Sequence, residues 1–137
     1  MPGQFTLGKH ERLKSRKQIE QLFREGKKIA VSPFYIYYLV NAVSDTMLNS
    51  IQFGVGVSGK NFKRAVDRNR IKRLTREAYR LQKISLLQKL KDKKQQLFIF
   101  FIYTGKALPD FNLVKEKVAV ALKKLEKIVD ENISSNT

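Results

Sequence analysis

A dense run of basic residues at positions 60–80 is the part of the sequence best suited to binding a ligand. Nearly half of its residues are Lys or Arg, and only Asp67 and Glu77 are acidic. In a helix of about 100° per residue, most of the cations gather on the side opposite the apolar residues. Like charges four residues apart cost about 0.2–0.5 kcal/mol per pair, so a polyanion that neutralises them is favoured. The run predicts contact with a nucleic-acid backbone, and a merely solvated basic face is the alternative.

Asn69 lies in the centre of this run and carries no charge. The surrounding Arg side chains can bind phosphate oxygens with two parallel hydrogen bonds. The Asn69 amide both donates and accepts, so it could contact a ribose, a base edge or a metal-bound water. An ordinary surface Asn is the alternative.

A catalytic constellation is not evident in the sequence. The chain has no Cys, which excludes disulfides, thiolate zinc sites and Cys nucleophiles. Its one His, His10, lies in a segment expected to be flexible, and the acidic residues lack paired or metal-ligand spacing. Gly54, Gly56 and Gly59 are not followed by the Lys and Ser or Thr of a phosphate loop. We therefore expect no catalytic residue and no metal ligand in the protein, so that a partner supplies any chemistry.

Aromatic residues form a second candidate group, namely Phe23, Phe34, Tyr35, Tyr37 and Tyr38. Most of them are expected in the core. One or two should line a groove in which bases of a single-stranded nucleic acid can stack.

Composition narrows the class of protein further. The 137 residues suit one domain, and 28 Lys and Arg against 12 Asp and Glu give a net charge of +16. This charge favours a nucleic-acid partner first and an anionic membrane surface second. No segment has the roughly 20 apolar residues of a membrane span, and the N-terminus lacks the apolar core of a signal peptide. We therefore expect a cytoplasmic protein.

The elements that position these residues follow from the hydrophobic periodicity. Ser15 is expected to cap a helix that carries Ile19, Leu22 and Phe23 and that Gly26 closes. We expect strands at 34–40, 51–58 and 97–103. The first of these should be covered on both faces, and the last should lie in the centre of the sheet. Helices are expected at 64–83 and after 112, a turn at 44–50 and a polar connector at 89–96. The order helix, strand, strand, helix, strand, helix predicts an α+β fold with helices packed on a small mixed sheet. Residues 1–12 are expected to form a flexible basic arm, 13–130 one RNA-binding domain and 131–137 a frayed tail.

The strand at 51–58 has one face of small or polar residues, namely Gln52, Gly54, Gly56 and Ser58. Its two glycines leave room for a close neighbour. Either a packed helix or a bound ligand strand could occupy that space.

Residues 65–77, AVDRNRIKRLTRE, closely resemble the Arg-Asn-Arg signature of the ribonuclease P protein family. Residues 55–58, VGVS, resemble the strand end before that signature, and Arg12-Leu13-Lys14 with Ile19 and Phe23 is similar to the family's first helix. The resemblance implies a left-handed parallel crossover through the signature helix. It also implies a surface for the catalytic RNA, made of Lys60, Lys63, Arg64, Arg68, Asn69, Arg70, Lys72, Arg73 and Arg76. It further implies a cleft for the 5′ leader of precursor tRNA, which we assign to Ile19, Phe23, Phe34 and Tyr37.

The resemblance implies an accessory subunit of the endoribonuclease that removes the leader, with catalysis and Mg²⁺ in the RNA subunit. Asn69 could help to order the metal environment without being a primary ligand. Two departures are Ile19, where many members carry an aromatic residue, and Gly59, where a lysine is common. A ribosome-associated module that grips structured RNA is the alternative. A membrane-surface protein is disfavoured, because the core needs the apolar stripe of the last helix.

Overall fold

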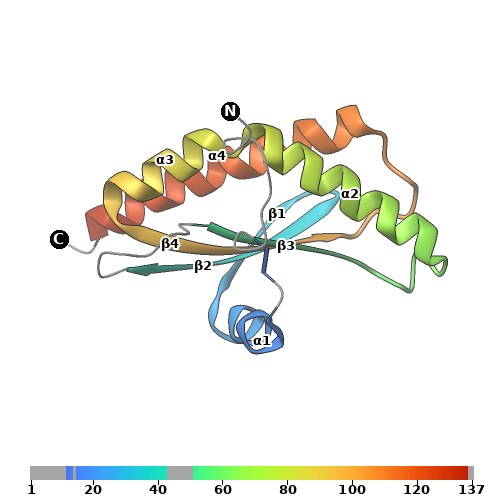
Figure 1. Cartoon of the computed structure of the whole chain (residues 1–137), viewed down its shortest axis with the longest axis horizontal. Helices are drawn as coiled ribbons and strands as arrows, with labels where there is room; N and C mark the ends of the chain where they lie inside the picture. The colour runs from blue at the N-terminus through green and yellow to red at the C-terminus, as the bar shows by residue number, and fades with distance from the viewer. Residues whose placement is uncertain (1–11, 14, 43–50, 136–137) are drawn as a thin grey trace.

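A mixed four-stranded sheet organises the chain (Figure 1). The computed structural model describes residues 12–13, 15–42 and 51–135. The strands are β1 (Lys27–Val31), β2 (Phe34–Ala42), β3 (Ile51–Val57) and β4 (Gln95–Tyr103), in the spatial order β1-β2-β4-β3. β2 is antiparallel to β1 and to β4, whereas β3 and β4 are parallel. The central place expected for 97–103 is therefore confirmed.

Four helices cover the two faces of this sheet. They are α1 (Arg16–Glu25), α2 (Ala65–Gln82), α3 (Ile84–Lys93) and α4 (Phe111–Ser135). α2, α3 and α4 lie on one face and α1 lies on the other (Figure 1). α1 begins at Ser15, whose hydroxyl accepts a hydrogen bond from the Gln18 N–H, and Gly26 ends it. The α+β class is confirmed, and α2 with α3 forms the parallel crossover; its left-handed sense stays a prediction.

Two apolar clusters follow from the alternation of side chains along the strands. The larger lies under α2, α3 and α4 and includes Ile36, Ile99 and Phe101, each fully buried. The smaller lies under α1 and joins Leu13, Leu22 and Phe98. Because successive strand residues point to opposite faces, one sheet separates these clusters.

Two elements were missed in the sequence. β1 is an edge strand of five residues with a largely exposed pattern, so it carries little hydrophobic signal. The polar connector expected at 89–96 is wrong, because α3 reaches Lys93 and β4 begins at Gln95. Leu86 and Leu90, four residues apart and both fully buried, are the periodic signal that identifies α3.

α4 extends further than expected. It reaches Ser135 and so includes most of the segment expected as a frayed tail. The turn expected at 44–50 lies outside the described residues. Among the helices of the described ranges, none is long and apolar enough to cross a membrane.

The face of β3 that carries Gly54 and Gly56 is covered by a side chain of the neighbouring strand β4. A Cβ placed on Gly54 would lie 2.6 Å from Cδ1 of Phe100, and one placed on Gly56 would lie 3.1 Å from its Cε2. Phe100 is on β4, where it pairs with Gly54 in the parallel register. The close neighbour is therefore the ring of Phe100, and neither a helix nor a ligand is needed to explain the glycines.

Replacing Gly54 with Ala is expected to destabilise the protein by about 1–3 kcal/mol, because the new methyl group must displace the Phe100 ring. Urea unfolding measures the change. Gly59→Ala is the matched control, since a Cβ there has no neighbour within 4 Å. Equal stability of Gly54→Ala and wild type would contradict the predicted clash.

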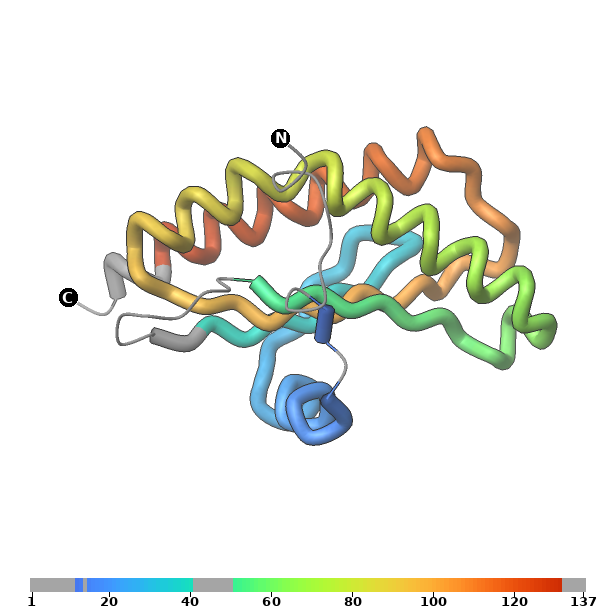
Figure 2. Tube along the Cα trace, in the orientation of Figure 1, coloured from blue at the N-terminus to red at the C-terminus, as the bar shows by residue number. Residues whose placement is uncertain are grey.

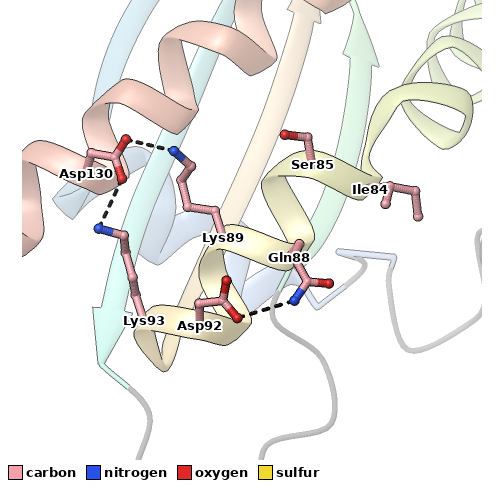
Figure 3. Close-up of a pocket in the computed structure, with 7 residues that line it drawn as sticks. All are labelled: Ile84, Ser85, Gln88, Lys89, Asp92, Lys93 and Asp130. Atoms are coloured by element: carbon pink, nitrogen blue, oxygen red, sulfur yellow. Dashed lines mark hydrogen bonds and ion pairs between the residues drawn. The ribbon is translucent and has the colours of Figure 1, made fainter.

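α3 runs alongside α4 (Figure 2). Mainly polar residues of α3 line a pocket together with Asp130 of α4 (Figure 3). Asp130 of α4 accepts hydrogen bonds from Lys89 Nζ at 2.8 Å and lies 3.0 Å from Lys93 Nζ. Hydrogen bonds from Lys89 and then Lys93 hold the pKa of the Asp130 carboxyl below its ordinary value. Lys89 and Lys93, which were expected in a polar connector, therefore link α3 to α4.

This lowered pKa predicts a pH-dependent contribution to stability. A carboxyl group whose pKa is lowered in the folded state stabilises the fold at pH values above its unfolded pKa of 3.8. This contribution is lost as the pH falls through the pKa of the folded state. Asp130→Asn is therefore expected to lower the urea midpoint at pH 7, and the difference from wild type should shrink near about pH 3. An unchanged difference at both pH values would show that the Lys contacts do not stabilise the charged form.

Candidate nucleic-acid interface

α2 places its cations differently from the helical wheel drawn from the sequence. Its buried residues are Ile71, Thr75, Ala78 and Tyr79. Leu81 is 38% exposed although it is apolar, whereas Tyr79 is fully buried and its ring stacks on Phe53 of β3 at 4.1 Å. The core face is therefore turned toward Tyr79. As a result, Arg68, Lys72 and Arg76 are half-buried, and Asn69, Arg70 and Arg73 occupy the exposed face.

Three arginines of the basic run have partners within the protein. Arg68 Nη1 donates to the carbonyl oxygens of Phe62 at 2.9 Å and Lys63 at 2.7 Å. Arg64 pairs with Asp67 at 3.2 Å. Arg80 donates to Glu77, and this hydrogen bond lowers the pKa of the Glu77 carboxyl. Arg68 is therefore part of the structure that holds the loop before α2, besides being a candidate RNA contact.

The remaining cations of this surface have no acidic partner within the described ranges. Among the described residues, no ion pair involves Lys60, Lys63, Arg70, Lys72, Arg73 or Arg76. Asn69 lies between Arg68 and Arg70 and is exposed. We call the set Asn69, Arg70, Lys72, Arg73 and Arg76 the basic face of α2. Its uncompensated positive charge suits a polyanion.

The loop from β3 to α2 is held against the end of β4. Asn61 Nδ2 donates to the carbonyl oxygens of Thr104 at 3.4 Å and Gly105 at 3.3 Å. Phe62 is buried beside Tyr103, with ring centroids 6.0 Å apart. These contacts position the exposed Lys60 and Lys63 next to the first turn of α2.

A second surface lies on the opposite side of the sheet, beside α1. The ring of Phe23 lies 4.7 Å from that of Tyr37 and 5.4 Å from that of Phe100. Phe23 is 43% exposed although it packs on the sheet. Ile19 and Tyr37 are half-buried against the smaller cluster. We call Phe23, Tyr37 and Phe100 the aromatic surface, and its partly exposed rings can stack on bases.

Phe34 does not belong to this surface, and its assignment to the leader cleft is wrong. It is 1% exposed and packs edge-on against Phe101 and Tyr103 in the larger cluster. Phe34 and Tyr37 are three residues apart on one strand, so their side chains point to opposite faces. The expectation that both faces of this strand are covered is also wrong at Tyr35, which is 41% exposed.

Three residues at or beside the second surface do not stand out in the sequence. Phe100 is predicted only as part of the central strand, and the aromatic pattern does not distinguish Tyr35 from its neighbours. Lys28 of β1 lies over the ring of Tyr35, with Nζ 4.6 Å from the centroid. The two-residue period would have placed Tyr35 with Tyr37, whereas Lys28 depends on the pairing of β1 with β2.

The acidic residues that the structure describes near these surfaces do not gather into a metal site. In the part of the chain that the structure describes, no three His, Cys, Asp or Glu side chains gather in a way that could hold an ion. Asp67 and Glu77 are both paired with arginines. His10 lies outside the described residues.

Comparison with known proteins identifies relatives along most of the chain. The family model described as Ribonuclease P matches residues 7–126. The "Ribonuclease P protein component" of Porphyromonas gingivalis is 39% identical over 121 residues, which cover 88% of this chain and 87% of the relative. The protein of that name from Chlorobium phaeobacteroides is 33% identical over 123 residues, 83% of this chain and 84% of the relative.

Solved structures agree with this result. The RNase P protein from Thermotoga maritima is 28% identical, with a TM-score of 0.63 over 83% of this chain and 96% of that one. A Staphylococcus aureus RNase P protein structure has a TM-score of 0.65 at 22% identity, covering 84% of this chain and 94% of that one, and shows the shared fold.

Proposed function

This chain belongs to the ribonuclease P protein family, and we propose that it binds the catalytic RNA through the basic face of α2 and the 5′ leader of precursor tRNA through the aromatic surface. Family membership gives it a role in tRNA 5′ processing, as the protein component of an endoribonuclease with an RNA partner. The proposal includes the cytoplasmic location expected from the sequence.

The proposed contact with the catalytic RNA is supported by one observation: no described acidic residue pairs with the cations on the basic face of α2. Arg70 and Arg73 are exposed, and neither has an ion pair among the described residues. A solvated helix face would normally alternate its charges, whereas phosphates relieve the repulsion between neighbouring cations. Lys60, Lys63 and Arg64 extend this surface before α2, and Arg68 contributes mainly by holding the loop.

The leader contact is supported by the exposure of aromatic rings on a rigid support. Phe23 rests on Tyr37 and Phe100, and its 43% exposure leaves ring surface for a base. Ile19 supplies apolar lining without a ring. Lys28, which lies over the ring of Tyr35, adds a positive charge that can pair with a phosphate of the leader. Single-stranded RNA is bound by this combination of stacking and charge.

Mg²⁺ is proposed to be held mainly by the RNA subunit, as the resemblance implies. The described carboxylates do not fit a protein-held ion near α2, because Asp67 and Glu77 are engaged by Arg64 and Arg80. We therefore assign no catalytic residue to the protein. Its proposed contribution is affinity for substrate and for the partner RNA.

A general module for structured RNA remains the competing function, since it would use the same basic face. It does not account for the aromatic surface on the opposite side of the sheet. A leader-dependent effect therefore separates the two functions.

The test is reconstitution with a bacterial ribonuclease P RNA at low Mg²⁺. Adding this protein is expected to produce cleaved 5′ leader from precursor tRNA under conditions in which the RNA alone is inactive. RNA-free protein is expected to cleave nothing. Failure to stimulate cleavage would contradict the proposed function, and cleavage by the protein alone would contradict the assignment of catalysis to the RNA.

A further inference from the structure

The edge of β3 carries a residue that the sequence placed in a flexible arm. Arg12 forms a parallel bridge with Phe53, and the N–H of Leu13 donates to the carbonyl oxygen of Phe53 at 2.8 Å. Figure 2 shows this short segment beside β3. Leu13 is 4% exposed and packs with Leu22 and Phe98 under the sheet. The position of Arg12 is therefore determined by the fold.

The side chain of Arg12 is directed toward α2. Leu13 packs on the α1 side of the sheet, and neighbouring residues of an extended backbone point to opposite sides. Phe53, the bridge partner of Arg12, stacks on Tyr79, which follows Arg76 by three residues on α2. The same β3 residue thus contacts both the N-terminal segment and α2.

Arg12 and Arg76 carry like charges and lie on the same side of β3, because both neighbour the Phe53–Tyr79 contact. Burial and then the charge of Arg12 lower the pKa of the Arg76 guanidinium. In the described part of the chain, no carboxylate pairs with either arginine. Two neighbouring guanidinium groups, one of them half-buried, repel each other unless an anion lies between them. Their planar donors suit the oxygens of a phosphate.

We propose that Arg12 and Arg76 hold one phosphate of the partner RNA between them, so that the N-terminal segment and α2 clamp the RNA backbone at the edge of β3. This phosphate clamp rests on the proposed function, because it requires RNA to bind the basic face of α2. It adds a contact from a different element, and it couples the two arginines through a single ligand.

The test is a double-mutant cycle on binding of a transcribed bacterial ribonuclease P RNA to the full chain. Arg12→Gln and Arg76→Gln are each expected to weaken binding by about tenfold. The double variant should bind only slightly more weakly than either single variant, because the first substitution already removes the shared phosphate. The slope of log affinity against log salt should fall by about 1 in all three variants, because each loses the same phosphate contact. Independent effects that multiply to about a hundredfold, or no effect of Arg12→Gln, would overturn the clamp.

Two further measurements distinguish the clamp from a structural role of Arg12 and from a general effect of net charge. The melting temperature of free Arg12→Gln should not fall, since the substitution removes a repulsive neighbour; a clear decrease would assign Arg12 a structural role and overturn the proposal. Lys124→Gln, which removes an exposed charge on α4, is the control for net charge and should bind RNA nearly as well as wild type. A loss as large as that of Arg12→Gln would overturn the clamp.

The failure of the clamp and the failure of the proposed function give different results. If Arg70→Ala with Arg73→Ala weakens RNA binding while the clamp variants do not, only the clamp is wrong. If neither set has an effect, the proposed function itself is wrong.

Discussion

Replacing Arg70 and Arg73 together with Ala is expected to weaken binding of ribonuclease P RNA by roughly a hundredfold. Both side chains are exposed on α2 and have no ion pair among the described residues, so they are available to phosphates. A hydrogen bond to a charged group contributes about 1.5–3 kcal/mol, and two such losses give this factor. The slope of log affinity against log salt should fall by about 2. Filter binding over a series of KCl concentrations measures both quantities.

The fold should survive this double substitution, because neither residue touches the core. Lys123→Ala with Lys124→Ala on α4 removes the same charge from exposed positions and should change RNA affinity much less. Arg68→Ala is unsuitable as evidence for an RNA contact, because it also removes the hydrogen bonds to Phe62 and Lys63. Normal binding by a folded Arg70 and Arg73 double variant would refute the role assigned to the basic face.

Tyr37→Ala in the holoenzyme is expected to weaken binding of precursor tRNA by about tenfold or more, and to leave binding of mature tRNA nearly unchanged. Stacking on a base contributes roughly 1–3 kcal/mol, and only the precursor has a leader to stack. Tyr37 also supports Phe23 at 4.7 Å, so its loss disturbs both rings. The measurement is the ratio of precursor to mature tRNA affinities at fixed salt and Mg²⁺.

Phe23→Ala and Phe34→Leu serve as a matched pair for this prediction. Phe23 is 43% exposed beside Tyr37, so Phe23→Ala should lower the same ratio of precursor to mature tRNA affinities. Phe34, in contrast, is 1% exposed in the larger cluster. Phe34→Leu should cost stability and affect both tRNAs alike. Circular dichroism verifies that each variant is folded. An unchanged ratio for folded Tyr37→Ala and Phe23→Ala would mean that these rings only stabilise the fold.

The sequence by itself determined the class of fold and the family. Ser15 and Gly26 mark the ends of α1, because capping depends on local residue types. The strands β2, β3 and β4 and the helices α2 and α4 follow from local apolar periods. The excess of cations at 60–80 and the Arg-Asn-Arg signature identified RNA as the partner class. All these features are carried by neighbouring residues in the chain.

The tertiary structure decided which side chains of those elements are available. Stacking of Tyr79 on Phe53 turns α2, so that Arg70 and Arg73 are exposed and Arg76 is half-buried. Pairing of β2 with β4 places Phe34 in the larger cluster and Phe100 beside Phe23. The bridge to β3 moves Arg12 from an expected flexible arm to the edge of the sheet. These outcomes depend on contacts between residues far apart in the chain, so no local period or residue type could determine them.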